Sequence, residues 1–324
     1  MTAWRADNDD RVPCANWLAS YFGRDRGALV CSGSIALELA LLHLGVKPGW
    51  RVVVSSHSCP QVPAAVLRSG ATPVIVDTSQ DLVLTARALA DLDDPPQAVI
   101  AVHEWGMPCP LREVREMLGD DVPIIEDAAQ AWGMHRESAQ DVDVAEVVVT
   151  SLGPRKPLSI DGGGAAFANS SIDADIDTWS AGQRQRNRPA FPVALSKYAL
   201  PHIVAAVERA EAQTFYLRGH VPELLERLTS LGLRPWPADA RHPPGWHFIP
   251  VKAPNAAAFE RLRFAPESIE LGVAAPALLQ NVPMLSGCIF RGSRPTPNLW
   301  LLLDPHAALE NRTSFERWGK RVRA

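Results

Sequence analysis

Hydrophobic and polar positions follow two alternating patterns through the first half of the chain. Short runs rich in Val, Ile and other apolar residues predict strands, and longer segments in which apolar residues recur among Ala, Glu and Arg predict helices. Strands that alternate with helices predict βαβ units and a mostly parallel sheet. The predicted strands are 51–54, 72–76, 98–102, 122–125 and 144–150, and the predicted helices are 34–44, 61–69 and 111–118.

The second half of the chain has a different pattern. Residues 191–231 are predicted to be mostly helical with a break near 219–222, and a Pro-rich segment follows at 233–254. Further strands are predicted at 246–251 and 299–303, and a final helix at 313–322. The chain is therefore predicted to be an α/β protein, with a large domain over residues 1–205 and a smaller α+β domain over 206–324.

Composition restricts the class of protein. The 324 residues are 47% hydrophobic and 21% charged, as in a globular protein, and the net charge of −4 argues against binding to nucleic acid through bulk positive charge. The chain begins without an apolar leader and has no run of about 18 apolar residues, so we expect neither a signal peptide nor a membrane span. Five scattered cysteines without a Cys-x-x-Cys pair favour a reducing compartment, so the expected location is cytoplasmic.

Three segments contain candidate chemistry. Cys31-Ser32-Gly33-Ser34 precedes the first predicted helix, where free N–H groups and hydroxyls can bind phosphate or simply cap the helix. Asp127 ends a predicted strand, where it could hold a protonated ring nitrogen or serve as an N-cap. Lys156, one of only five lysines, follows another strand in a Gly/Pro-rich segment, either as a Schiff-base lysine or as a solvated one. No Cys/His spacing is typical of zinc, so no metal is expected.

In this order, the three segments resemble the DegT/DnrJ/EryC1/StrS family of aminotransferases, which have the pyridoxal-phosphate-dependent fold type I. The phosphate turn comes first, the Asp-Ala-Ala-Gln motif at 127–130 second, and Ser-x-x-x-x-Lys at 151–156 third. The segments 45–52, 70–77 and 102–108 are similar to the family as well, and the resemblance covers roughly residues 25–170.

The resemblance implies pyridoxal 5'-phosphate as cofactor. Lys156 would form the Schiff base with the cofactor aldehyde and transfer the proton, and Asp127 would pair with the pyridinium nitrogen. Gln130 would lie near the phenolic oxygen. The phosphate would be held by Gly33, Ser34, the N–H of Ile35 and Ser151.

Two segments depart from the family pattern. The position of the aromatic residue that stacks on the pyridine ring falls on Cys59, and His57 could take over the stacking; alternatively, Cys59 is a small filler and His57 a surface or core-edge histidine. The segment 182–189 replaces the family's Gly-Tyr-Asn-Tyr-Arg-Met-like sequence. Asn187 and its neighbouring arginines could bind a phosphate or carboxylate, or the segment is a solvated basic loop.

The resemblance implies an enzyme that moves an amino group from an amino acid, glutamate or glutamine, to a keto sugar, keto cyclitol or related ketone in secondary-metabolite or polysaccharide biosynthesis. Its partners would be this small-molecule donor and acceptor and a second copy of the chain in a homodimer. Two alternatives stay open. One is a different pyridoxal-phosphate reaction, namely elimination, dehydration or C–C bond formation. The other is a non-catalytic, partner-dependent family member.

Overall fold

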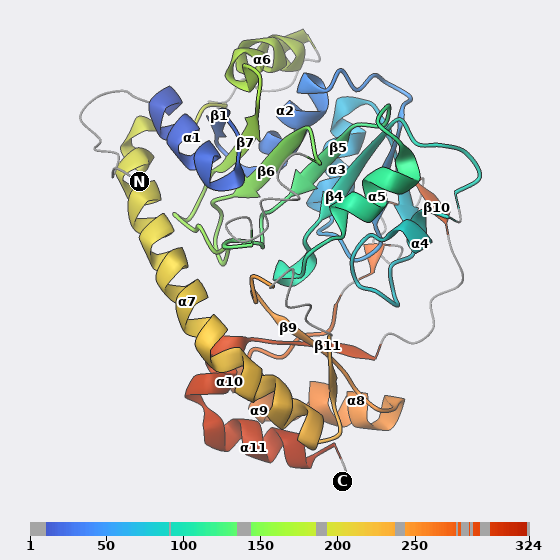
Figure 1. Ribbon diagram of the computed structural model, residues 1–324, viewed down its shortest axis with the longest axis vertical. Coiled ribbons are helices and arrows are strands. Elements are labelled where there is room, and N and C mark those ends of the chain that lie inside the picture. The colour runs from blue at the N-terminus through green and yellow to red at the C-terminus, as the bar shows by residue number, and fades with distance from the viewer. Residues whose placement is uncertain are drawn as a thin grey trace.

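The computed structural model describes residues 11–90, 92–134, 144–185, 193–236, 244–276, 278–279, 285, 288–291 and 299–322. The described chain forms an eight-stranded sheet in the order β1-β7-β6-β5-β4-β2-β3-β10 and a three-stranded sheet in the order β11-β9-β8. Figure 1 shows the large sheet with its helices at the top, the small sheet with its helices at the bottom, and the long helix α7 beside both. We call these two parts the large body and the small body.

The large sheet is mostly parallel, which confirms the predicted fold class. Its β10-β3-β2-β4-β5-β6 part is parallel, whereas at one edge β7 is antiparallel to both of its neighbours, β6 and β1. Its strands are β1 (Arg26–Val30), β2 (Arg51–Ser55), β3 (Thr72–Val76), β4 (Ala98–Val102), β5 (Ile124–Asp127), β6 (Val147–Ser151), β7 (Gly164–Ala168) and β10 (Ile289–Arg291).

All five strands predicted in the first half of the chain exist, but β1 and β7 were not predicted. Their sequences, RGALV and GAAFA, are rich in Gly and Ala, which have low strand propensity. They form strands because they pair with each other along their full length and are buried. Tertiary pairing therefore overrides the local preference of these residues.

Helices cover both faces of the large sheet. Alternate residues of one strand point to opposite layers, so Val52 and Val54 pack toward α2 and α3, whereas Val53 packs toward α4 and α5. The helix α1 and the start of α7 extend the second layer over β7 and β1. The helices of the large body are α1 (Arg11–Ala19), α2 (Gly33–His43), α3 (Gln61–Ser69), α4 (Ala86–Leu89), α5 (Leu111–Leu118) and α6 (Asp175–Gln185), with short 3₁₀ turns η1 (Ser20–Phe22), η2 (Glu104–Gly106), η3 (Ile172–Ala174) and η4 (Lys197–Ala199).

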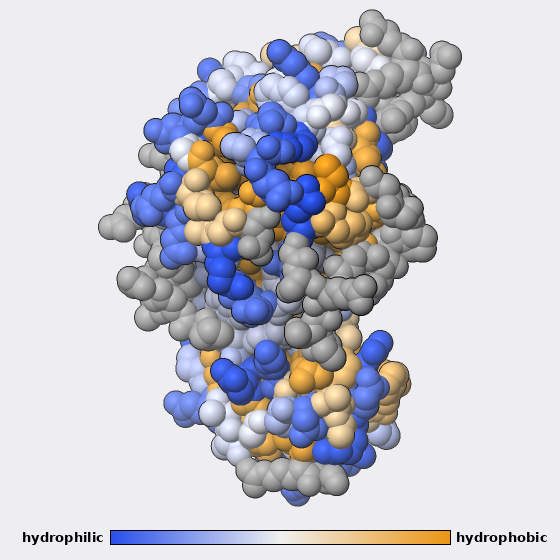
Figure 2. Space-filling model, turned by 90° about the vertical axis from the view of Figure 1, so that its right-hand side faces the viewer, coloured by the Kyte–Doolittle hydropathy of each residue, from blue (hydrophilic) through white to orange (hydrophobic). Residues whose placement is uncertain are grey.

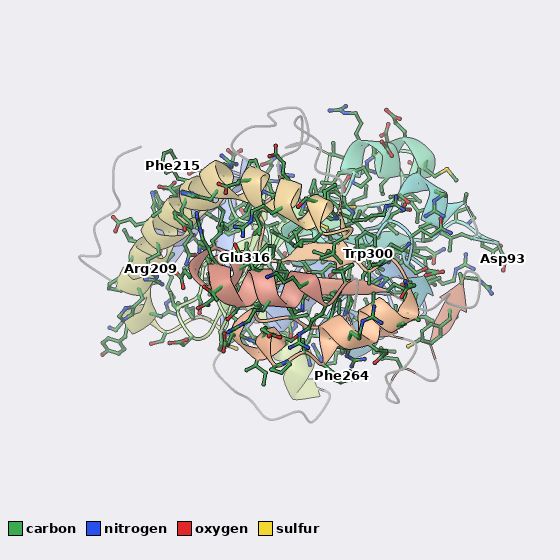
Figure 3. The ribbon with its side chains drawn as sticks, turned by 90° about the horizontal axis from the view of Figure 1, so that it is seen from below. Asp93, Arg209, Phe215, Phe264, Trp300 and Glu316 are labelled. Atoms are coloured by element: carbon green, nitrogen blue, oxygen red, sulfur yellow. The ribbon has the colours of Figure 1, made fainter. Side chains whose placement is uncertain are left out.

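The small body packs helices against an antiparallel sheet. Phe315 and Trp318 are its largest fully buried side chains. Figure 3 views this body from below, with Glu316 on α11 and Trp300 on β11 labelled. Its elements are β8 (Arg234–Pro235), β9 (Ile249–Lys252), β11 (Trp300–Leu303), α8 (Ala256–Arg263), α9 (Glu267–Glu270), α10 (Pro305–Glu310) and α11 (Arg312–Lys320).

The helix α7 (Leu200–Ser230) is continuous over 31 residues, so the break predicted near 219–222 is wrong. Pro222 lies inside it, on the exposed side, while Val221 and Leu224 beside it are buried in the small-body core. This packing keeps the helix intact through a residue that lacks an N–H donor. The start of α7 packs in the large body instead, so the predicted boundary after residue 205 falls inside one helix, and the division into two domains stays a prediction.

The surface of both bodies is mixed. On the face that Figure 2 shows, hydrophilic and hydrophobic residues are interspersed over the larger upper body and the smaller lower one. None of the helices in the described ranges combines the length and apolar character that crossing a membrane requires.

Candidate active site

The first candidate residues lie at the start of α2. Ser32 caps this helix, because its Oγ accepts a hydrogen bond from the N–H of Ile35 at 3.2 Å. A Cβ atom at residue 33 would lie only 2.9 Å from Cβ of Ser151 and 3.0 Å from its Oγ, so Gly33 brings the helix start directly against the end of β6. Gly33, Ser34, Ile35 and Ser151 therefore form one cluster at the positive end of the helix, which favours an anion, although the N–H of Ile35 already donates to Ser32.

Asp127 ends β5 at the same edge of the sheet. Its side chain is only 5% exposed, and Oδ1 accepts a hydrogen bond from the N–H of Ala129 at 2.9 Å. Burial raises the pKa of Asp127, whereas the Ala129 N–H and then the positive charge of Lys156 lower it. Because burial disfavours its ionised form, the Asp127 carboxylate would be stabilised by a further positive charge, such as a protonated ring nitrogen.

Lys156 lies in the loop between β6 and β7. The loop folds back on itself, since the N–H of Leu152 donates to the carbonyl of Gly163 at 3.0 Å and the N–H of Lys156 donates to that of Gly153 at 3.2 Å. Arg155 has a positive φ of 61°, a conformation that a non-glycine residue rarely adopts. This turn positions Lys156 near enough to Asp127 for its charge to affect that carboxyl, so two residues that the sequence singled out separately share one site.

His103 connects the ends of β4 and β5. Its Nε2 lies 2.7 Å from Oε1 of Glu126, and its Nδ1 accepts a hydrogen bond from the N–H of Cys109 at 2.9 Å. Its own N–H donates to the carbonyl of Asp127 at 3.1 Å. With Nδ1 as acceptor, the imidazole proton lies on Nε2 and is donated to Glu126. These bonds fix the strand end that carries Asp127.

His57 and Cys59 have different environments. His57 is 4% exposed, its Nδ1 lies 3.0 Å from Oγ1 of Thr78, and its ring contacts Trp105 edge-on at 5.8 Å between centroids. Burial lowers the pKa of His57 to about 4, against a smaller opposing effect of Asp77, so the imidazole is neutral. Cys59 is an exposed free thiol. Which of the two lies against a cofactor ring stays a prediction.

Two residues at this edge were not found by sequence reasoning. Glu104, in η2 directly after β4, is 1% exposed, and burial raises the pKa of its carboxyl to about 8. His247 comes from the small body. The segment 244–248 packs on η2, with the N–H of Phe248 donating to the carbonyl of Trp105 at 3.0 Å. Burial, followed by the charges of Lys156 and Arg155, lowers the pKa of His247 to about 3.

A sequence signal existed for Glu104 alone. It is a charged residue directly after an apolar strand, inside the segment 102–108 that supported the family resemblance. His247 follows Lys156 by 91 positions, and no local pattern connects them. Gln130 is half-buried beside η2, and its backbone carbonyl oxygen lies 2.9 Å from the position that a Cβ on Gly106 would take. Asn187 and its neighbouring arginines at 186 and 188 lie outside the described residues.

In the ranges that the structure describes, no group of three or more His, Cys, Asp and Glu side chains lies together as a metal site requires. The site consists of an anion-binding cluster, a buried carboxylate and a lysine at the carboxyl edge of a parallel sheet, where α/β folds bind ligands. Together with the mostly parallel large sheet and the small antiparallel sheet, it defines the pyridoxal-phosphate-dependent fold type I.

The chain belongs to the DegT/DnrJ/EryC1/StrS aminotransferase family, whose model matches residues 14–214. It is 35% identical over 152 residues to a dTDP-3-amino-3,4,6-trideoxy-alpha-D-glucose transaminase of Streptomyces venezuelae, a match that covers 46% of this chain and 40% of that protein. It is 28% identical over 201 residues to a GDP-perosamine synthase of Caulobacter vibrioides, covering 60% of this chain and 54% of that protein. The matches thus span about half the length of these relatives.

Solved structures extend the likeness to the small body. The GDP-4-keto-6-deoxy-D-mannose-3-dehydratase of E. coli, solved with bound hydrated pyridoxal phosphate, superposes with a TM-score of 0.81. This alignment covers 96% of this chain and 91% of that one at 15% identity. At this identity the superposition establishes the fold, including the part of the chain that the family model does not match.

Proposed function

We propose that this chain is a pyridoxal-phosphate-dependent aminotransferase that moves an amino group from an amino acid, glutamate or glutamine, to a keto sugar or a related ketone. The observation that carries the proposal is that one edge of the sheet brings together buried Asp127, paired with Val149 of β6, the anion-binding cluster of Gly33 and Ser151, and the loop after β6 that holds Lys156. Support comes from the names of the relatives, a transaminase named for a dTDP-linked amino sugar and a synthase named for GDP-perosamine.

The residues present fit the cofactor. The first turn of α2 and the hydroxyls of Ser34 and Ser151 would hold the phosphate, and Lys156 would attach to the aldehyde. Burial raises the pKa of Asp127. A protonated ring nitrogen would give this carboxyl a positively charged partner and so favour its ionised form. Gln130 would lie at the phenolic oxygen. When bound, the cofactor supplies an electron sink for the substrate's α-carbon.

The protein's own residues would then control protons. Asp127 would keep the proton on the ring nitrogen, and the hydrogen bond from the Ala129 N–H fixes one oxygen of its carboxylate. Nζ of Lys156 would accept the proton that leaves the substrate's α-carbon and then donate it to a second carbon atom. His247, neutral because of burial and the neighbouring cations, would close the site from the small-body side.

A second reaction type has one observation in its favour. The structural relative from E. coli is a dehydratase with the same fold and cofactor, so the fold alone supports more than amino transfer. In this chain, the exposed Cys59 stands at the expected ring-stacking position. Dehydration, elimination or C–C bond formation is therefore the alternative to test alongside amino transfer.

The test begins with the purified protein and pyridoxal phosphate. We expect a visible absorption band and, after borohydride reduction, a phosphopyridoxyl group on Lys156 in the peptide mass spectrum. Lys156→Ala should show neither, whereas Lys197→Ala, at an exposed lysine, should show both. Conversion to pyridoxamine phosphate by glutamate or glutamine would support amino transfer. Loss of water from a substrate without that conversion would favour the alternative, and no attachment at all would contradict both.

We also propose that the protein works as a cytoplasmic homodimer, because members of its family share their sites between two subunits. Sedimentation velocity of the cofactor-loaded protein should give twice the mass of the 35.2 kDa chain. An active monomer would contradict this proposal while leaving the proposed chemistry intact.

A further inference from the structure

The carboxyl of Glu104 has no part in the proposed reaction, yet it lies inside the site. The side chain is 1% exposed, and Oε1 is buried without a hydrogen-bond partner among the described residues. Oγ of Ser58 is buried and lacks a partner in the same way. Ser58 is near enough to favour the ionised form of Glu104, although their geometry is not that of a hydrogen bond.

The sheet explains how Glu104 comes close to the proposed cofactor residues. Strand β4 lies between β2 and β5, and Val102 at its end is paired with Asp127. Glu104 follows two residues later, just beyond this pair. The loop after β2 is held against it, because the ring of His57 contacts that of Trp105. Glu104 is thus enclosed by loops from three adjacent strands.

The groups around Glu104 determine its charge state. Asp127 faces it from β5 and Lys156 from the loop after β6, while Ser58 faces it from the loop after β2. On its own loop lies Cys109, whose thiol pKa is raised by burial first and then by Glu126 and Glu104. A carboxylate that is removed from water, next to a second carboxylate and with one oxygen unpaired, is strongly destabilised relative to the neutral acid.

We infer that this site keeps Glu104 as a neutral acid at physiological pH, so that its carboxyl presents a hydrogen-bond donor rather than a second negative charge beside Asp127. Burial is the main cause that raises the pKa of Glu104 to about 8, Ser58 opposes it, Asp127 adds to it, and Lys156 lowers it.

The first test uses the cofactor-free protein, in which only the proton on Glu104 matters. Between the ordinary carboxyl pKa of 4.5 and about 8, the folded state binds more protons than the unfolded state, so stability falls as pH rises. The folded-to-unfolded ratio of the wild type should fall by up to about tenfold per pH unit relative to Glu104→Gln across this window. Glu116→Gln, at an exposed position of the same body, should follow the wild type. Parallel profiles for wild type and E104Q would overturn the inference.

A second measurement avoids dependence on the folding of the variant. In wild-type protein labelled with ¹³C at the glutamate carboxyl, one resonance should titrate near pH 8. Glu116→Gln should keep this resonance, and E104Q, where it folds, should lose it. If every glutamate carboxyl of the wild type titrates within its ordinary range, the inference is wrong.

Discussion

Nε2 of His103 lies 2.7 Å from Oε1 of Glu126, and both side chains are almost completely buried. Glu126 directly precedes Asp127 in β5, and the backbone N–H of His103 donates a hydrogen bond to the carbonyl of Asp127. The position of the Asp127 carboxylate therefore depends on hydrogen bonds made by His103 and Glu126, two residues to which we assign no part in the reaction.

Removing one partner of this pair should destabilise the fold. In His103→Ala, Glu126 loses the imidazole as a hydrogen-bond partner, and the N–H of Cys109 loses its acceptor. We expect the free energy of unfolding to fall by about 1–3 kcal/mol, the usual cost of leaving a buried polar group without its hydrogen-bond partner. Urea unfolding measures it. Glu126→Gln keeps a neutral acceptor for His103 and should cost clearly less, and equal losses in the two variants would contradict this explanation.

The neutral state of His57 predicts a dependence of stability on acid. Burial lowers the pKa of its imidazole from 6.5 to about 4, so the unfolded state binds a proton that the folded state does not bind in this window. Stability attributable to His57 is therefore complete above pH 6.5 and is lost progressively toward pH 4, by up to roughly 3 kcal/mol. Unfolding of His57→Asn compared with wild type over this range should show a shallower decline, whereas His220→Asn, at an exposed position of α7, should not.

The contact between Gly33 and Ser151 predicts a specific loss of cofactor binding. In Gly33→Ala, the new Cβ would overlap Cβ of Ser151 at 2.9 Å and displace the hydroxyl that we assign to the phosphate. We expect the Kd for pyridoxal phosphate to rise at least about tenfold, equivalent to roughly 1.4 kcal/mol. Gly162→Ala provides the matched control, since a Cβ there meets nothing within 4 Å. Fluorescence titration distinguishes the two, and equal affinities would refute the assignment.

Asp127→Asn should separate chemistry from stability. The amide keeps an oxygen for the N–H of Ala129 but carries no charge, and because burial raises the pKa of Asp127, losing that charge does not weaken the fold. Turnover should fall by roughly 10²–10⁴, the range for loss of a group that controls a proton in the reaction. Steady-state rates and unfolding curves of the same preparation decide the matter. Unchanged turnover would exclude the proposed role.

The sequence predicted the strands and the helix that bring the candidate residues to one edge of the sheet. Gly33 begins α2, Asp127 ends β5, Ser151 ends β6, and Lys156 follows in the loop after β6. Their roles in the site stay predictions. The residues that sequence reasoning missed came by other routes. His247 reaches the site through packing of the small body on η2, a contact between distant segments that no periodicity encodes.

The errors in the predicted fold also come from contacts between distant segments. The Ala- and Gly-rich strands β1 and β7 are stabilised by pairing with each other, and α7 continues past Pro222 because its buried side packs in the small body. In both cases, contacts made only in the folded chain outweigh the preference of the local residues. Residues 182–185 of the segment 182–189 end the helix α6, and residues 186–189, including Asn187, lie outside the described residues.

The 31 residues of α7 span about 46 Å at 1.5 Å per residue, and its two halves contribute to the cores of different bodies. Ile203 and Val207 are buried in one core, and Leu224 and Leu228 in the other. Melting either core exposes half of the same helix and removes the packing that a long helix needs in water. The helix thus makes unfolding cooperative across the molecule, so that the chain should lose both bodies in a single calorimetric transition.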